Sequence, residues 1–167
     1  MPARLALATS ISLLAVLDTW LFVGPLVIAL PAFVWVSFLA WGCHYHCGGG
    51  SKGATATIAC MSWGAVVGAV VAILATGPFS GAGQFGAPIA VGLGVVVICL
   101  SSAVSLLSAI PASLYGFAAI AAPILLGGMR AQDAILPMIS AIIIGTVFGY
   151  VSETLATALT RKRARSA

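Results

Sequence analysis

The sequence predicts an all-α membrane protein: a polytopic bundle of about six transmembrane helices in a single domain, residues 1–167. Three observations favour this fold class. Of the 167 residues, 62% are apolar and only 6% are charged, against about 25% charged in a typical soluble domain. The mean hydropathy is +1.20. The whole stretch between Lys52 and Arg130 carries no formal charge, as expected where a bilayer penalises every charge in its core.

The predicted spans are apolar segments that approach the roughly 20 residues needed to cross a hydrocarbon core of about 30 Å. Glycine and proline separate them, because proline removes a backbone donor and clashes with the preceding helical turn. The spans are placed at about 5–23, 31–46, 53–76, 86–103, 111–126 and 134–158.

The connections between the spans are short and rich in glycine, proline or serine. They are placed at Gly24–Leu30, Cys47–Ser51, Gly77–Gly83, Val104–Ile110 and Gly127-Gly128. The first and the fourth occupy equivalent positions in the two halves of the chain. They are either ordinary tight loops or broken-helix segments that expose backbone polar groups to a cavity.

The distribution of basic residues predicts the orientation. Six crossings put both termini on the same side, and a basic C-terminal tail places that side in the cytoplasm by the positive-inside rule. The segment Met1–Arg4 precedes an apolar run without a small-residue cleavage site, so it is interpreted as the start of a retained first helix. The net charge of +4 reflects the tail and does not indicate nucleic-acid binding; the predicted partner is the lipid bilayer. The tail residues are Arg161, Lys162, Arg163 and Arg165.

An internal repeat is visible as pairs of short matches. Pro31-Ala32 recurs as Pro111-Ala112 at an offset of 80, and the segment Gly64–Gly68 matches Gly145–Gly149 at an offset of 81. A unit of three crossings must be inverted in its second copy. The sequence therefore predicts a 3+3 inverted-topology repeat, with halves at about 5–76 and 86–158, which is an architecture typical of transporters and channels.

The matched glycines form two GxxxG patterns, each in the third helix of its half. Gly64, Gly68, Gly145 and Gly149 are expected to let helix backbones approach closely. Packing within the monomer is the first interpretation and a homo-oligomer contact is the second.

Two acidic residues inside predicted spans are candidates for pore-lining or coupling residues. Asp18 is followed by Trp20, which marks the interfacial aromatic belt. Asp18 is therefore either a hydrated carboxylate near the outer interface or a coupling carboxylate. Glu153 is expected either to pair with the basic tail or to line an inner vestibule.

The run Cys43-His44-Tyr45-His46-Cys47 is a candidate for pH gating or for a weak metal site. Thiolates and imidazoles suit zinc or copper. However, His44 and His46 lie about 160° apart on a helix, and no second set of ligands appears. A metal site is therefore not the favoured interpretation; the others are imidazoles that sense pH at a cytoplasmic pore mouth and interfacial residues without a special role. A disulfide framework is not expected.

No catalytic set emerges. The loop residues Gly49, Gly50, Lys52 and Gly53 form a glycine-rich segment with a lysine, but the Walker spacing is absent. An enzyme is not expected, and neither is a cofactor.

The glycine-rich loop and its surroundings resemble a known family, the YcdZ-like bacterial inner-membrane proteins, called domain of unknown function 1097. The Gly-Gly-x-Lys-Gly sequence is the most specific element. The resemblance implies a multi-pass protein of the bacterial inner membrane and supplies no reaction or substrate. It is carried by Phe38–Trp41, Gly49–Gly53, the helix that bears Gly64, Ile110–Gly116 and Leu136–Tyr150. His44 and His46, and likewise Asp18, depart from the pattern expected of the family.

The leading functional hypothesis is a channel or permease for a small neutral or weakly charged solute, because few charges lie inside the spans. The alternative is a non-transporting membrane subunit that stabilises or regulates a partner protein through its GxxxG faces. A pH-responsive or metal-responsive membrane protein is the third hypothesis.

Overall fold

The computed structural model describes residues 2–25 and 33–164, with side chains described as far as Thr160. These residues form α-helices joined by short turns and two 3₁₀ segments, and they contain no strand, so the all-α prediction is confirmed. The elements are α1 (Ala3–Val23), α2 (Val34–His46), α3 (Gly50–Thr76), η1 (Ser80–Phe85), α4 (Gly86–Ser101), η2 (Ser105–Leu107), α5 (Ile110–Leu125) and α6 (Ala131–Ala164).

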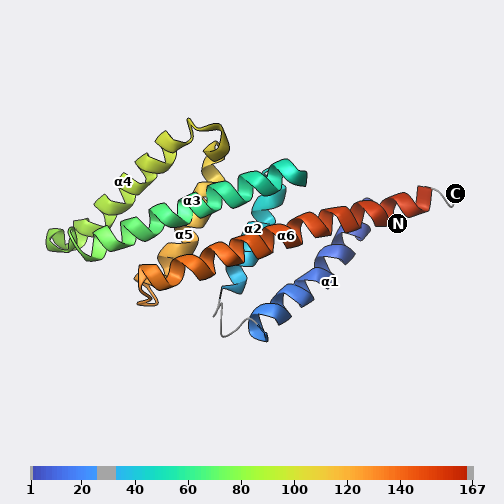
Figure 1. The fold of residues 1–167 in the computed structure, drawn as a ribbon, viewed down its shortest axis with the longest axis horizontal. Helices are drawn as coiled ribbons and strands as arrows, with labels where there is room; N and C mark the ends of the chain where they lie inside the picture. The colour runs from blue at the N-terminus through green and yellow to red at the C-terminus, as the bar shows by residue number, and fades with distance from the viewer. Residues whose placement is uncertain (1, 26–32, 165–167) are drawn as a thin grey trace.

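Two long helices form the centre of the molecule. Figure 1 shows α3 and α6 side by side and running in opposite directions. Helices α1 and α2 pack against α6, and α4 and α5 pack against α3. The first turn of α1 and the last turn of α6 lie at the same end of the molecule (Figure 1).

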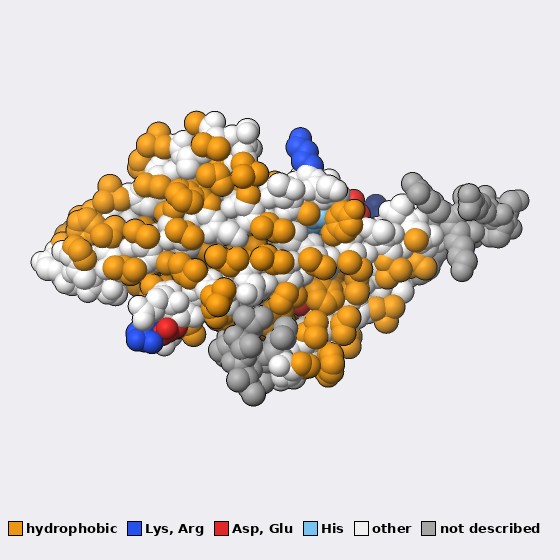
Figure 2. All heavy atoms as spheres, in the orientation of Figure 1, with side chains coloured by type: hydrophobic (Ala, Val, Ile, Leu, Met, Phe, Trp, Pro, Cys, Tyr) orange, Lys and Arg blue, Asp and Glu red, His pale blue; other side chains and the backbone are white. Residues whose placement is uncertain are grey.

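The surface of this bundle is that of a membrane protein. Figure 2 shows apolar side chains spread over the visible faces of the helices, with few charged groups among them. Four segments of the described chain are long and apolar enough to cross a membrane: Ala3–Val23, Gly50–Thr76, Ser80–Ser101 and Ala131–Thr160. The prediction of a helical membrane bundle is confirmed.

Helices α2 and α5 have fewer residues than the roughly 20 needed to cross a bilayer; α5 has the predicted length and is displaced by one residue. Helix α2 has 13 residues and α5 has 16, so they extend over only about 20 Å and about 24 Å at 1.5 Å per residue. Phe33 has non-helical backbone angles and precedes the first turn of α2, whereas the predicted start at residue 31 lies outside the described residues. The predicted connection Gly24–Leu30 falls mostly outside them too. The equivalent connection, Val104–Ile110, contains η2 and ends at the first residue of α5.

The start of α3 also differs from the prediction. The helix begins at Gly50, so Gly50, Lys52 and Gly53 belong to its first turn and not to a loop. Gly49, with φ of +69°, directly precedes the helix. Helix α6 is longer than predicted at both ends.

The helix contacts form an ordered pattern. If α1 is exchanged with α4, α2 with α5 and α3 with α6, each of the major helix pairs becomes another major pair. The contact of α5 with α3 corresponds to that of α2 with α6. The contact of α4 with α3 corresponds to that of α1 with α6, and the central α3–α6 pair corresponds to itself.

The same correspondence holds for the four glycines of the GxxxG patterns. A Cβ atom on Gly64 would overlap the carbonyl oxygen of Ser113 in α5, and one on Gly145 would overlap the carbonyl oxygen of Ser37 in α2. Helix backbones come this close only where no side chain intervenes.

The second glycine of each pattern repeats the arrangement one turn later. A Cβ atom on Gly68 would lie 2.6 Å from Cγ2 of Ile120, and one on Gly149 would lie 2.9 Å from Cβ of His44. All four glycines therefore lie at contacts between helices of one chain.

These contacts change the register that the sequence suggested for α2 and α5. The corresponding serines, Ser37 and Ser113, are 76 residues apart, whereas the predicted pairing of Pro31 with Pro111 required 80. Pro31 itself lies outside the described residues. The glycine pairs keep the offset of 81, since the extra residues lie at the end of α5 and in its longer connection to α6.

Candidate functional site

Helix α2 carries polar side chains on the surface that it packs against α1 and α6. These contacts lie within an apolar bundle, where unpaired polar groups are costly and paired ones are a sign of specific function or specific packing. They form three groups along α2.

The first group is the pair of Asp18 and Ser37. The Ser37 hydroxyl donates a hydrogen bond of 2.9 Å to Oδ1 of Asp18, and both side chains are fully buried. Within the described chain, Oδ2 of Asp18 has no hydrogen-bond partner. This burial does not fit the predicted hydrated carboxylate at a helix end, and the role of Asp18 as a coupling carboxylate stays a prediction.

The second group is a hydroxyl cluster formed by Trp41, Tyr45 and Ser152. The Ser152 hydroxyl donates to the carbonyl oxygen of Gly149 over 2.8 Å, so its oxygen serves as the acceptor for both aromatic side chains. Trp41 Nε1 lies 2.9 Å from it and Tyr45 Oη lies 2.7 Å from it. The cluster ties the C-terminal half of α2 to α6.

We expect Ser152→Ala to lower the free energy of unfolding by about 2 kcal/mol, because the buried indole N–H and the tyrosine hydroxyl lose their acceptor. Thermal unfolding of the purified protein in detergent measures the change. Ser62→Ala is the matched control, since the Ser62 hydroxyl is buried without a hydrogen-bond partner in the described chain. A loss of stability no larger for Ser152→Ala than for this control would contradict the role of the cluster.

The third group is a carboxylate junction formed by Glu153, His44, Gly49 and Gly50. Oε2 of Glu153 accepts a hydrogen bond of 2.7 Å from the backbone N–H of Gly50 and lies 3.0 Å from Nε2 of His44. His44 is fully buried, whereas the Glu153 side chain is 39% exposed. The junction joins α6 to the end of α2 and to the first residue of α3, whose N–H groups have no partner within the helix.

Gly49 and Gly53 lie where other groups come too close to the backbone to leave room for a side chain. A Cβ atom on Gly49 would lie 2.8 Å from Oε1 and 2.9 Å from Oε2 of Glu153. A Cβ atom on Gly53 would lie 2.8 Å from the carbonyl oxygen of His44. Gly49 thus lets the α2–α3 turn approach α6 and Gly53 lets the start of α3 approach the end of α2, while Lys52 is exposed.

The remaining residues of the Cys43–Cys47 run separate into different surroundings. His46 is exposed, and its ring lies 5.9 Å from that of Tyr115. The two thiols, Cys43 Sγ and Cys47 Sγ, are 3.8 Å apart and not bonded. The structure does not bring the two imidazoles together, and no group of three or more possible metal ligands occurs within the described parts of the chain.

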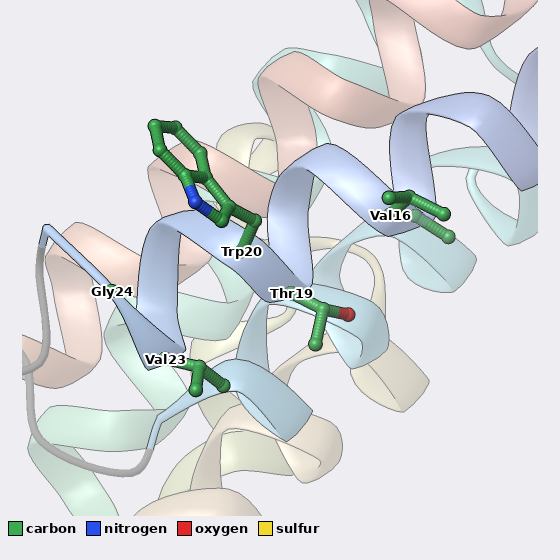
Figure 3. Close-up of a pocket in the computed structure, with 6 residues that line it drawn as sticks. Val16, Thr19, Trp20, Val23 and Gly24 are labelled. Atoms are coloured by element: carbon green, nitrogen blue, oxygen red, sulfur yellow. The ribbon is translucent and has the colours of Figure 1, made fainter.

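Trp20 lies on a different side of α1 from Asp18. It is 56% exposed and lines a surface hollow of about 580 Å³. Figure 3 shows that the lining residues Val16, Thr19 and Val23 come from the same helix, so this hollow is a depression along α1. The structure therefore does not bring Trp20 and Asp18 into one site.

Glu153 borders two hollows near the ends of α1 and α6. One, of about 360 Å³, includes Gly50 and Tyr150 in its lining. The other, of about 270 Å³, includes Ala3 and Tyr45. The predicted position of Glu153 in an inner vestibule stays a prediction, and its predicted pairing with the basic tail concerns side chains outside the described part of the structure.

Sequence reasoning did not assign roles to Ser37 and Ser152. Serines within apolar spans were the available signal, but many serines in such helices only donate to a carbonyl of the preceding turn. What distinguishes Ser37 is its acceptor, Asp18, on another helix.

A family model described as "Protein of unknown function (DUF1097)" matches residues 8–157. The match includes most of α1 and α6 and everything between them. The match confirms the family resemblance that the glycine-rich sequence indicates. No curated protein and no solved structure gives a significant match.

Proposed function

Because the chain belongs to the DUF1097 family and its long apolar helices are those of a membrane-embedded protein, we propose that it is a channel or permease for a small neutral or weakly charged solute. The observation that carries the proposal is the matched packing of two helix triplets. Each major contact made by α1, α2 and α3 has a counterpart made by α4, α5 and α6.

Matched triplets have a specific meaning in a bilayer. A unit with an odd number of crossings can be repeated along one chain only with inverted orientation, and inverted repeats place their permeation site where the two halves meet. The antiparallel pair α3 and α6 lies at the centre of this arrangement (Figure 1). The packing thus supports a 3+3 inverted repeat.

The polar side chains favour a route along α2. The position of His44 over Gly149 is taken by the apolar Ile120 over Gly68 in the other triplet. Polar groups inside a membrane bundle are costly and typically mark a pathway. We therefore assign the route to the α1, α2 and α6 side, with the Asp18–Ser37 pair in its interior and the carboxylate junction at its end.

The solute class follows from the small number of ionised groups. Asp18 and Glu153 are the only carboxylates on this side in the described chain, and each already accepts a hydrogen bond from the protein. A multivalent ion would require more compensation than these residues provide. We further propose that the protein lies in the bacterial inner membrane with both termini in the cytoplasm, since the first turn of α1 and the last turn of α6 share one end (Figure 1).

A flux assay tests the proposal. The full chain is reconstituted into proteoliposomes, and stopped-flow swelling is recorded over a panel of small polyols, amides and weak acids. We expect at least one solute to enter faster than into empty vesicles. Swelling that matches empty vesicles for every solute, with correctly folded protein in the membrane, would contradict transport.

Two corresponding serines provide a matched pair of variants. Ser37→Ala removes the hydrogen bond to Asp18 and is expected to change the rate by roughly fivefold, about the effect of one hydrogen bond of 1 kcal/mol. Ser113→Ala at the corresponding position of the other triplet removes a buried hydroxyl that has no partner in the described chain, and it should leave the rate unchanged. Equal effects of the two variants would argue against a route beside α2.

A further inference from the structure

The hollow between α6 and the start of α3 has a lining that selects for one kind of ligand. We call it the Glu153 hollow; it has a volume of about 360 Å³ and is lined by Gly50, Tyr150, Glu153, Thr154, Thr157 and Ala158. It lies along α6 beside the first residue of α3. Its chemistry follows from an inventory of donors and acceptors.

The carboxylate of Glu153 presents one oxygen to this hollow. Both recorded hydrogen bonds, from the N–H of Gly50 and with Nε2 of His44, converge on Oε2. Oε1 has no recorded partner among the described residues, and the side chain is 39% exposed. An ionised carboxylate only accepts hydrogen bonds, so Oε1 can bind a hydrogen-bond donor or a cation.

The two threonines of the hollow are also acceptors. The hydroxyl of Thr154 donates to the carbonyl oxygen of Tyr150 over 2.9 Å, and that of Thr157 donates to the carbonyl oxygen of Glu153 over 2.9 Å. A hydroxyl has a single hydrogen. Because that hydrogen is used within α6, each threonine offers only oxygen lone pairs to a ligand.

The backbone and the aromatic side chain in the lining also favour a cationic ligand with hydrogen-bond donors. The N–H of Gly50 is used by Glu153 and so is not available to an anion. Tyr150 is 43% exposed and is one of the lining residues; aromatic rings attract organic cations. In the described structure no Lys or Arg side chain forms an ion pair with Glu153.

We propose that the Glu153 hollow binds an alkylammonium group. Its N–H donors match the carboxylate and threonine oxygens, and its carbon atoms match Tyr150. This chemistry is shared by a free primary amine and by the headgroup of an aminophospholipid. The proposal does not rest on transport, since binding here requires no pathway through the protein.

Calorimetry with ethylammonium chloride tests the site. The full chain is placed in nanodiscs of phosphatidylglycerol, in a buffer free of amines, so that the probe is the only ammonium present. We expect saturable binding that Glu153→Gln weakens at least roughly tenfold, because a charge-assisted contact is lost. Glutamine keeps an acceptor for Gly50, and the thermal unfolding of this variant is recorded to check that it folds.

A second variant leaves the carboxylate junction intact. Thr157→Val removes one acceptor oxygen at nearly constant shape and should weaken ethylammonium binding roughly threefold, the effect of a modest hydrogen bond. Thr55→Val is the matched control, because Thr55 makes the same kind of bond to Ser51 and does not line the hollow. No binding at all, or binding unchanged by both Glu153→Gln and Thr157→Val, overturns the proposal.

A lipid experiment separates the two sources of the ammonium group. Nanodiscs with equal amounts of phosphatidylethanolamine and phosphatidylglycerol are analysed by native mass spectrometry. Retention of phosphatidylethanolamine by the unmodified chain, and its loss in Glu153→Gln, identifies the headgroup as a ligand. Equal retention of both lipids, together with saturable ethylammonium binding, identifies a soluble amine. Absence of binding in both experiments rejects the site and leaves the flux assay as an independent test of transport.

Discussion

Glu153→Ala is expected to be among the most destabilising single substitutions on the polar side of α6. It removes the acceptor of the Gly50 N–H and the partner of the buried His44 side chain. Each buried group left without a partner costs about 1–3 kcal/mol, so we expect a loss of roughly 2–4 kcal/mol in the free energy of unfolding. Thermal unfolding in detergent and proteolysis near residues 47–50 measure it.

Two further variants separate the carboxylate from the turn that it holds. Glu153→Gln keeps an acceptor and should lose less than half as much stability as Glu153→Ala. Gly49→Ala leaves the carboxylate in place but puts a Cβ atom 2.8 Å from Oε1, at a backbone φ of +69° that favours glycine. It is expected to resemble Glu153→Ala. If Gly49→Ala were as stable as the unmodified chain, it would contradict the close contact between Gly49 and the Glu153 carboxylate.

The sequence was sufficient to predict the class of fold for a physical reason. A bilayer excludes charge and requires every backbone polar group to be bonded within the helix, and both demands are visible in composition and spacing. The glycines at 64, 68, 145 and 149 were also recognisable, because close helix packing depends on small residues at a fixed spacing. The structure adds which helix each glycine contacts.

The carboxylate junction was not predictable in the same way. Gly50 and Glu153 are 103 residues apart, and no periodicity within one helix indicates a hydrogen bond between them. Glycine in a helix interior costs about 1 kcal/mol relative to alanine, so a run of glycines by itself indicates a loop. The positive φ angles of the glycines before α3 and the approach of Glu153 explain why glycines begin this helix.

The boundaries of α2 and α5 lie close to the prediction, but their registers against the long helices do not follow from the sequence. Helix α5 has the predicted 16 residues, displaced by one, and α2 ends at the predicted residue, His46. Their registers against α6 and α3 are set by close backbone contacts, of which Ser37 with Gly145 and Ser113 with Gly64 are the tightest of those at the four GxxxG glycines. Contacts of this kind depend on how two backbones lie in space, and the residue composition of a helix does not indicate it.

Those two contacts lead to the second large expected effect. Gly145→Ala and Gly64→Ala should each lower the free energy of unfolding by about 3 kcal/mol, at the upper end of the usual cost of overpacking. The added methyl group would overlap a backbone carbonyl oxygen in each case. A backbone cannot rotate away as a flexible side chain can, so the helices must separate. Thermal unfolding in detergent measures both variants.

Gly92→Ala is the matched control, because Gly92 lies in α4 and a Cβ atom there meets nothing within 4 Å. It should be neutral or slightly stabilising, since alanine favours the helix and glycine does not. The size of the two losses also bears on the repeat. If the triplets are related by exchange of α3 with α6, the two substitutions should cost similar amounts. A large loss at Gly145 with none at Gly64 would mean that α2 and α5 do not pack in corresponding ways, and the central support for a pathway between the triplets would be lost.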